Sequence, residues 1–375
     1  MSGSQQFRTY LYCICALDAL MKRSVKHAVM PRRALSEGRD RPPMLENRAG
    51  KLRLDMNENL LGCSPKVRAA LQQLDEQMLA MYPEKETAIA RLAPLFGVHA
   101  DEMLVAGGID ETLRLIADVY IERGRCVLLV EPTFPMYRFY SEQRDARIRT
   151  VCYDREMRFP MREVLRELKT TPSIFFLANP NNPTGSLLDA RALGKILDAA
   201  RRTLVVIDEA YVEFSGVTVL PQIRRRRNLA VTRTFSKATG LAGLRVGCIF
   251  AHRDVARVLK RAQAPFPIGA AALVAAEAAL EDRAFVGHAV QRIRRGRATL
   301  ERGLRRLGVQ VFPSAANFVL VDFGGRGPAI VAALERRGIL VRDQAASFAR
   351  PGFVRITVGT AKQMQTCLRT LEMLL

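Results

Sequence analysis

The sequence has little of what a metal site or a disulfide framework requires. It contains four histidines and seven cysteines in 375 residues, and no two cysteines form a CxxC pair. Metal sites usually draw several such ligands from short spacings, so we expect no metal. An odd number of scattered cysteines is typical of a reduced, intracellular protein, and we therefore expect the chain to be cytoplasmic.

Long apolar runs are also missing. No stretch reaches the ~20 apolar residues that a helix needs to cross a membrane. The short apolar stretch from Tyr10 to Met21 is followed, rather than preceded, by Lys22 and Arg23, which largely reverses the charge order of a secretory signal peptide. We therefore expect neither secretion nor a membrane partner. Residues 1–50 are treated as an N-terminal extension or arm, and Met30 as the true start is one hypothesis.

Acidic residues are outnumbered, with 37 Asp and Glu against 58 Lys and Arg, which gives a formal net charge of +21. Such a balance permits binding to nucleic acid. The basic residues are spread along the chain rather than gathered in a tail, and the densest run, Arg224 to Arg227, reads as a solvated loop. We expect small-molecule partners and no nucleic acid.

Helix-like and strand-like segments alternate after residue 85. This pattern predicts an α/β fold with a mostly parallel sheet covered by helices on both faces. Helices are predicted over 110–122, 161–169 and 188–201, and strands over 125–130, 173–178, 204–207, 229–232 and 246–250.

The pattern of predicted helices and strands changes after about residue 267, where a smaller α+β domain is predicted. A long helix over 270–307 comes first. Strands over 310–312, 318–321, 339–341 and 353–358, a helix over 329–337 and a C-terminal helix follow. We expect residues 81–267 to form the large domain and residues 51–80 with 268–375 to form the small one.

Two polar motifs directly follow predicted strands, where open α/β sheets place ligands. The first is Asn179-Pro-Asn-Asn-Pro-Thr-Gly185, whose prolines and glycine fix a tight loop with free side-chain amides. The second is Asp208-Glu-Ala-Tyr211; a carboxylate at the mouth of an apolar strand favours a cationic partner. A rigid turn and a helix N-cap, respectively, are the plainer alternatives.

Two further motifs suit an anion. Thr234-Phe-Ser-Lys237 is followed by Gly240-Leu-Ala-Gly-Leu-Arg245, which combines hydroxyls, an amine nucleophile and an arginine able to hold phosphate through two hydrogen bonds. A solvated basic turn is the alternative. Gly107-Gly-Ile-Asp-Glu111 heads a predicted helix whose backbone amides can bind phosphate, although these residues equally suit an ordinary helix start.

The order of these motifs along one chain resembles the fold-type I aminotransferases that depend on pyridoxal 5'-phosphate (PLP). Within them, the chain is similar to the histidinol-phosphate aminotransferase branch, over about residues 51–375. That branch is also indicated by Asp55-Met-Asn-Glu-Asn59, by Gly338 to Gln344 and by Arg355 to Thr360.

The resemblance implies a role for each cofactor-binding position. Lys237 would bind PLP as a Schiff base and move a proton between the substrate and the cofactor. Asp208 would pair with the pyridine nitrogen, and Asn182 and Tyr211 would hydrogen-bond the phenolic oxygen. The cofactor phosphate would be held by Ser236, Arg245 and the amides of Ile109 and Asp110 with help from Thr234, and Phe134 would stack on the ring.

The resemblance also implies the substrates. Arg355 would bind the α-carboxylate of glutamate, and Arg355 together with Arg342 would hold the phosphate of histidinol phosphate in the alternate half-reaction, with Asn182 beside them. Tyr82 would reach the cofactor phosphate of the partner subunit in a homodimer. The implied reaction converts histidinol phosphate and 2-oxoglutarate to imidazole-acetol phosphate and glutamate, and runs in reverse in histidine biosynthesis.

Some positions depart from the family pattern. Leu60 and Leu61 stand where a proline and an aromatic residue are common, Gly107 where asparagine is frequent, and Thr239 where an aromatic residue is common. These differences bear on substrate preference. The alternatives within PLP chemistry are an aromatic-amino-acid aminotransferase and a threonine-phosphate decarboxylase. An alternative from another class is a DNA-binding regulator built on such a domain, for which residues 1–50 are too short and irregular.

Overall fold

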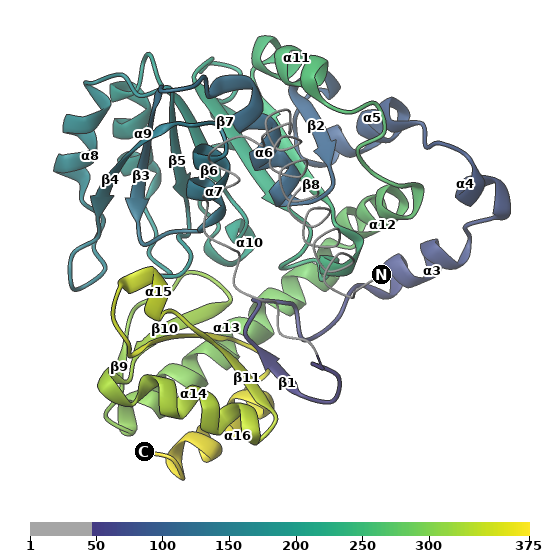
Figure 1. Ribbon diagram of the computed structural model, residues 1–375. Coiled ribbons are helices and arrows are strands. Elements are labelled where there is room, and N and C mark those ends of the chain that lie inside the picture. Colours follow the sequence, from purple (N-terminus) through teal and green to yellow (C-terminus); the bar gives the residue numbers. More distant parts are fainter. Residues whose placement is uncertain (1–46) are drawn as a thin grey trace, which may run out of the picture. The chain divides into compact units, whose positions relative to one another are not determined.

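Two β-sheets organise the protein in a computed structural model that describes residues 47–375 (Figure 1). The predicted extension over residues 1–50, with the hypothetical start at Met30, lies almost wholly outside these residues. The larger sheet has seven strands in the order β2-β8-β7-β6-β5-β3-β4. In that order they span Met103–Ala106, Gly247–Ala251, Leu229–Thr234, Leu204–Asp208, Ile174–Ala178, Cys126–Glu131 and Arg147–Cys152.

The seven-stranded sheet is largely parallel, as predicted. Strands β4, β3, β5, β6 and β7 pair in parallel, and β8 runs antiparallel to both of its neighbours. Successive side chains of a strand point to opposite faces. In β6, Val205 and Ile207 therefore enter one core and Leu204 and Val206 enter the other. A strand buried on both faces needs such an unbroken apolar run.

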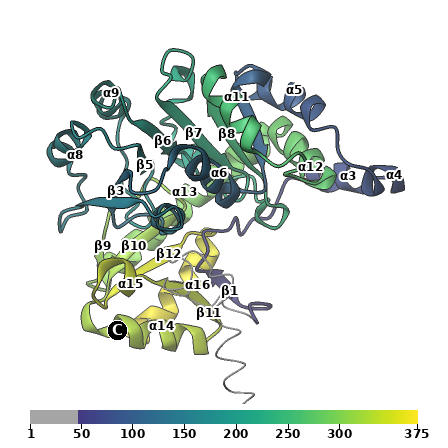
Figure 2. The ribbon, with the colours of Figure 1, turned by 45° about the horizontal axis from the view of Figure 1, so that its top comes forward.

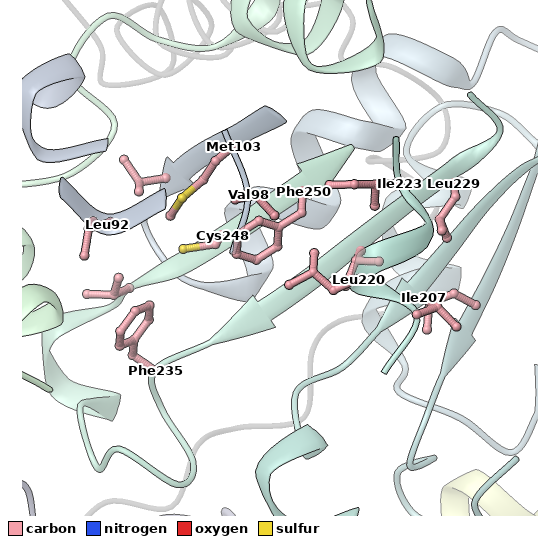
Figure 3. Packing of buried hydrophobic residues seen from close by; sticks show 14 of the residues in the cluster. Leu92, Val98, Met103, Ile207, Leu220, Ile223, Leu229, Phe235, Cys248 and Phe250 are labelled. Carbon is pink, nitrogen blue, oxygen red and sulfur yellow. The ribbon is translucent and has the colours of Figure 1, made fainter. Parts of the chain in front are cut away.

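Helices cover both faces of this sheet (Figures 1 and 2). Each fully buried aliphatic side chain contributes about 1.5–3 kcal/mol, and Figure 3 shows Leu92, Met103, Cys248 and Phe250 packed together in one of the two cores. That core includes residues of α5 (Lys85–Leu95), α8 (Met161–Leu168), α9 (Ala190–Ala199) and α12 (Ala270–Glu281). The other core includes residues of α6 (Ile109–Tyr120), α7 (Met136–Glu142) and α11 (Arg253–Ala262).

The second sheet has five strands in the order β1-β11-β12-β10-β9, and only the β1–β11 pair is parallel. These strands span Leu52–Leu54, Ile339–Asp343, Phe353–Thr357, Phe318–Asp322 and Gln310–Val311. Its core includes buried side chains of α13 (Arg283–Arg306), α14 (Gly327–Arg336) and α16 (Ala361–Glu372). The short helices are α3 (Pro65–Gln72), α4 (Glu76–Ala80), α10 (Val212–Ser215) and α15 (Ala345–Phe348).

The long helix predicted over residues 270–307 is wrong in one respect, because the structure divides it into α12 and α13 at Asp282. The Asp282 carboxylate accepts a hydrogen bond from the backbone amide of Phe285 at 3.2 Å and another from the Ser64 hydroxyl. A side chain that satisfies the free amides of a helix start begins a new helix there.

The domain boundaries at residues 80 and 267 remain a prediction. By core, β1 belongs to the five-stranded sheet, whereas Val67 of α3 and Ala272 to Ala279 of α12 pack with the seven-stranded sheet. Within residues 47–375, no helix is both long enough and apolar enough to span a membrane.

Candidate active site

Three of the predicted motifs meet at one edge of the seven-stranded sheet. Strands β5, β6 and β7 are adjacent and parallel, so their carboxyl ends lie at the same edge. The loop from Asn179 to Gly185 follows β5, Asp208 ends β6, and Ser236 and Lys237 follow β7. The fold thereby brings an amide loop, a carboxylate and an amine to neighbouring strand ends.

Lys237 donates a hydrogen bond from Nζ to the carbonyl oxygen of Met56 at 3.0 Å, and Nζ lies 5.9 Å from the centre of the Tyr211 ring. Burial, followed by the nearby positive charge of Arg355, lowers the pKa of this amine from 10.5 to about 8. A neutral amine is the form that attacks a carbonyl carbon. Lys237 is therefore prepared for nucleophilic chemistry near neutral pH.

Asp208 is a buried carboxylate, only 4% exposed. It accepts hydrogen bonds from the Tyr137 hydroxyl at 2.7 Å and from the Ala210 amide at 3.0 Å. Burial raises its pKa to about 6, against the opposing effect of the Tyr137 hydrogen bond. No salt bridge within residues 47–375 engages Asp208. A buried carboxylate in that condition favours a cationic partner supplied by a ligand.

Tyr137, on α7, is a functional neighbour that the sequence reasoning missed. Its side chain is fully buried, and its ring stacks on Phe176 at 5.2 Å between ring centres. Phe134, the predicted stacking residue, meets the same ring edge-on at 5.7 Å. An aromatic residue in a predicted helix is usually interpreted as a core residue. The local sequence does not predict that the Tyr137 hydroxyl contacts Asp208, 71 residues away.

Tyr211 is held by a network centred on Asn57, the second missed residue. The Asn57 side-chain amide donates to the Tyr211 hydroxyl at 2.9 Å, and its Oδ1 accepts from the Thr357 hydroxyl at 3.1 Å. The Asn317 side chain donates to the Asn57 carbonyl at 3.0 Å. Asn57 adopts a left-handed backbone conformation with φ of 54°, which asparagine tolerates better than most residues. The Asp55–Asn59 run contributes to the family resemblance, but the sequence does not predict the hydrogen bond between Asn57 and Tyr211.

An anion cradle lies at the N-terminus of α6. Gly108 precedes the helix with φ of +88°, and a Cβ built there would lie 2.7 Å from Arg245 Nη2. No side chain caps this helix start, so the amides of Ile109 and Asp110 are at the position where helices bind phosphate. Arg245 donates to the Asp110 carboxylate at 3.2 Å.

The hydroxyls predicted for the same cradle are close to each other. The Thr234 hydroxyl donates to the Ser236 hydroxyl at 3.0 Å and accepts from the Ser236 amide at 3.1 Å. Both residues are buried. Thr234 therefore orients Ser236.

Two arginines face each other across neighbouring strands of the five-stranded sheet. Arg342 of β11 and Arg355 of β12 occupy opposite positions. Arg355 donates to the Asn182 side-chain oxygen at 2.6 Å and to the Asp55 carbonyl at 2.5 Å. Burial, with Arg342 nearby, lowers the pKa of Arg355 to about 10. Like charges directly opposite each other are unfavourable, so this pair suits an anion.

Tyr82 lies on the surface, and it is more exposed than Arg245, the other exposed residue of the predicted site. Its side chain is 75% exposed, and its ring stacks on Phe266 at 4.0 Å between ring centres. Phe266 is itself 51% exposed. The two rings form an apolar surface on the described part of the chain.

Comparisons with known proteins agree with this geometry. The family described as aminotransferase class I and II matches residues 49–371. A histidinol-phosphate aminotransferase of Geobacillus sp. (strain WCH70) is 35% identical over 333 residues, covering 86% of this chain and 90% of the relative. One of Symbiobacterium thermophilum is 36% identical over 329 residues, covering 86% and 90%.

Two solved structures are also similar. The histidinol-phosphate aminotransferase of Sinorhizobium meliloti, in complex with PLP, superposes with a TM-score of 0.84 at 26% identity, covering 94% of this chain and all of that one. The L-threonine-O-3-phosphate decarboxylase of Porphyromonas gingivalis superposes with a TM-score of 0.75 at 25% identity, covering 86% and 99%.

The chain belongs to the class I and II aminotransferases. It has the fold-type I architecture and is a PLP-dependent transaminase. The residues present fit that cofactor: Asp208 is a buried carboxylate without a salt bridge in the described part of the chain, and the uncapped start of α6 is open to a phosphate.

Proposed function

We propose that the chain transfers an amino group from histidinol phosphate to 2-oxoglutarate, forming imidazole-acetol phosphate and glutamate. In histidine biosynthesis the same reaction runs in the opposite direction. The observation that carries this proposal is the opposed pair Arg342 and Arg355. Arg355 of this pair donates a hydrogen bond to Asn182, at the edge that also holds Lys237. A pair of guanidinium groups binds a carboxylate or a phosphate through several hydrogen bonds. One anion site can thus serve a phosphorylated amine and a dicarboxylic acid in turn.

The predicted residue roles are part of this proposal. When bound, PLP supplies an electron sink for the pair of electrons left at the substrate α-carbon. Lys237 would hold the cofactor covalently through its side-chain amine. Once the substrate amine has displaced it, this amine, with a pKa of about 8, would move the proton at the substrate α-carbon. Asp208 holds the proton on the pyridine nitrogen, and Tyr211 and Asn182 hydrogen-bond the phenolic oxygen.

The remaining roles fix the cofactor in place. Ser236, Arg245 and the amides of Ile109 and Asp110 bind its phosphate, with Thr234 orienting Ser236. The ring of Phe134 stacks on the cofactor, and Tyr137 holds Asp208 in its ionised, oriented form.

The same proposal includes a cytoplasmic homodimer. Met78, Leu79, Met81, Tyr82 and Phe266 are exposed apolar side chains in and around α4 and in the segment before α12. Exposed apolar patches of this kind mark surfaces that bind other proteins. A second copy would bury them and bring Tyr82 to the cofactor phosphate of its partner.

A threonine-phosphate decarboxylase is the second candidate, because the Porphyromonas gingivalis enzyme of that name has the same fold and its phosphorylated substrate would suit the same arginines. Leu60 and Leu61, which follow the Asn57–Asn59 segment, stand where the family commonly has a proline and an aromatic residue and so bear on substrate preference. The products distinguish the two activities. A decarboxylase releases CO2 and needs no keto acid, whereas a transaminase converts the cofactor to its amine form and needs a keto acid to restore it.

The test is a half-reaction. The PLP-loaded protein is mixed with L-histidinol phosphate while the cofactor absorbance is followed, and 2-oxoglutarate is then added and glutamate assayed. We expect loss of the PLP absorbance, its return with 2-oxoglutarate, and a matching yield of glutamate. An unchanged spectrum with histidinol phosphate, or CO2 release from O-phosphothreonine, would overturn the assignment of substrate.

A further inference from the structure

Asp55, which directly follows β1, is a fully buried carboxylate whose one salt bridge in the described part of the chain is with Arg48. Its side chain is 0% exposed, and Oδ1 accepts from Arg48 Nη2 at 2.7 Å. Its other oxygen, Oδ2, is buried and has no hydrogen-bond donor among residues 47–375. A buried carboxylate with one partner depends strongly on that partner.

The segment that begins at Asp55 touches the candidate active site at successive residues. The Asp55 carbonyl accepts from Arg355 Nη2 at 2.5 Å. The Met56 carbonyl accepts from Lys237 Nζ at 3.0 Å, and the side-chain amide of Asn57 donates to the Tyr211 hydroxyl at 2.9 Å. The backbone position of this short segment therefore sets acceptors for two predicted site residues.

Arg48 also reaches the far side of the same segment. Its Nη2 lies 3.1 Å from the Glu58 carboxylate, so one guanidinium joins the residues on either side of Met56 and Asn57. Arg53 makes a second ion pair with Glu58 but is more exposed, at 39% against 16% for Arg48. Arg48 is thus the partly buried arginine that spans the segment.

We propose that Arg48 is a positioning residue for the substrate-anion site: by neutralising Asp55 and tying it to Glu58, it fixes the Asp55 carbonyl that orients Arg355. The proposal rests on the proposed function, in which Arg355 binds the substrate anion. Without Arg48, the buried Asp55 carboxylate loses its one salt bridge in the described residues, and the segment is free to move so that the charge returns to water. Movement of the segment removes the acceptor from Arg355 Nη2, and the guanidinium loses its orientation toward substrate.

Besides the Asp55 carbonyl, Arg355 has two further contacts in the described part of the chain, one of them with the Phe318 ring, whose centre lies 5.5 Å from the guanidinium carbon. Its Nη1 donates to Asn182 and its Nε is buried without a partner within residues 47–375. Arg342 faces it from the neighbouring strand and repels it. The Asp55 carbonyl is therefore one of two protein acceptors that hold this guanidinium, and its loss should weaken anion binding about tenfold, the scale of one hydrogen bond to a charged group.

The test measures binding rather than turnover. Calorimetric titration of the PLP-loaded protein with 2-oxoglutarate, which cannot react with that form of the cofactor, gives Kd for the wild type, Arg48→Ala and Arg48→Ala/Asp55→Asn. The double variant keeps the carbonyl but removes the unpaired charge. Arg149→Ala is the matched control, because Arg149 pairs with Glu167 at 3.0 Å on the exposed edge strand β4.

We expect Kd to rise about tenfold in Arg48→Ala, to recover most of the wild-type value in the double variant, and to stay unchanged in Arg149→Ala. A Kd within twofold of wild type in Arg48→Ala, or no recovery in the double variant, overturns the inference alone. If Arg48→Ala does not fold, Arg48→Gln decides, because glutamine can donate a hydrogen bond but carries no charge to neutralise Asp55; wild-type affinity there overturns the inference. A wild-type protein that binds neither 2-oxoglutarate nor inorganic phosphate overturns the proposed function as well.

Discussion

Replacing Asp208 with asparagine should stabilise the cofactor-free protein while weakening its hold on PLP. In the structure, Asp208 is buried and its pKa lies at about 6 instead of 3.8 because burial disfavours the charged form. The folded protein therefore binds this proton more tightly than the unfolded chain does. Stability contributed by the protonated group is present below pH 4 and is lost as the pH rises through about 6.

The size of the effect follows from the shift. A change of about two pKa units corresponds to a cost of about 3 kcal/mol for ionising Asp208 at pH 8. About half of that cost is already present at pH 5, because the unfolded carboxyl is ionised there and the folded one is not. Asparagine carries no charge, so the stability advantage of Asp208→Asn over the wild type should grow by about 1–2 kcal/mol between pH 5 and pH 8.

The assay is urea unfolding of the PLP-free wild type and variant at both pH values, followed by PLP titration of each. Any hydrogen bond that asparagine makes less well than aspartate contributes equally at both pH values and cancels in the comparison. A stability difference that does not change with pH would refute the reasoning about burial. Equal PLP affinity of the two proteins would refute the pairing of Asp208 with the cofactor.

Three further predictions concern the same site. Tyr137→Phe removes the 2.7 Å hydrogen bond to the buried carboxylate and should weaken PLP affinity about tenfold, measured by absorbance titration; unchanged affinity would contradict it. The rate at which PLP-free protein takes up PLP should rise with pH and level off above about 8, since the pKa of Lys237 is lowered to that value; a rise continuing to pH 10 would argue against a depressed pKa. Gly108→Ala places a Cβ 2.7 Å from Arg245 Nη2 at a φ of +88°, so it should cost about 1–3 kcal/mol of stability and also lower PLP affinity. Gly124→Ala is the control: with a φ of +74° and open space around it, it should leave PLP affinity unchanged.

The parallel strands and their motifs were predictable because the information is local. Apolar runs such as Leu204 to Ile207 end at polar residues, and parallel strands place those residues at one edge. Strand β4 was not predicted because Arg147–Cys152 has neither an apolar run nor strict alternation: its two aliphatic residues, Ile148 and Val151, stand three positions apart. The break at Asp282 was missed although its cause is local, because apolar and helix-forming residues continue on both sides of this N-cap residue.

The hydrogen bonds around the candidate site were less predictable, because they join residues that are far apart in the sequence. Lys237, Asp208 and Asn182 belong to recognisable motifs, but Tyr137 and Asn57 act through contacts 71 and 154 residues apart. Side-chain identity alone does not say which hydroxyl meets which carboxylate once the sheets have assembled. Arg48 reaches Asp55 over seven residues, yet its importance depends on the carbonyl of Asp55 meeting Arg355.

The most direct test of the proposed active site is to identify the residue that bonds to PLP. The PLP-loaded protein is reduced with borohydride, digested, and analysed by mass spectrometry. We expect the pyridoxyl group on the peptide that contains Lys237, and no label in Lys237→Ala. A label on another lysine, or a wild-type protein that carries none, would contradict the proposed site.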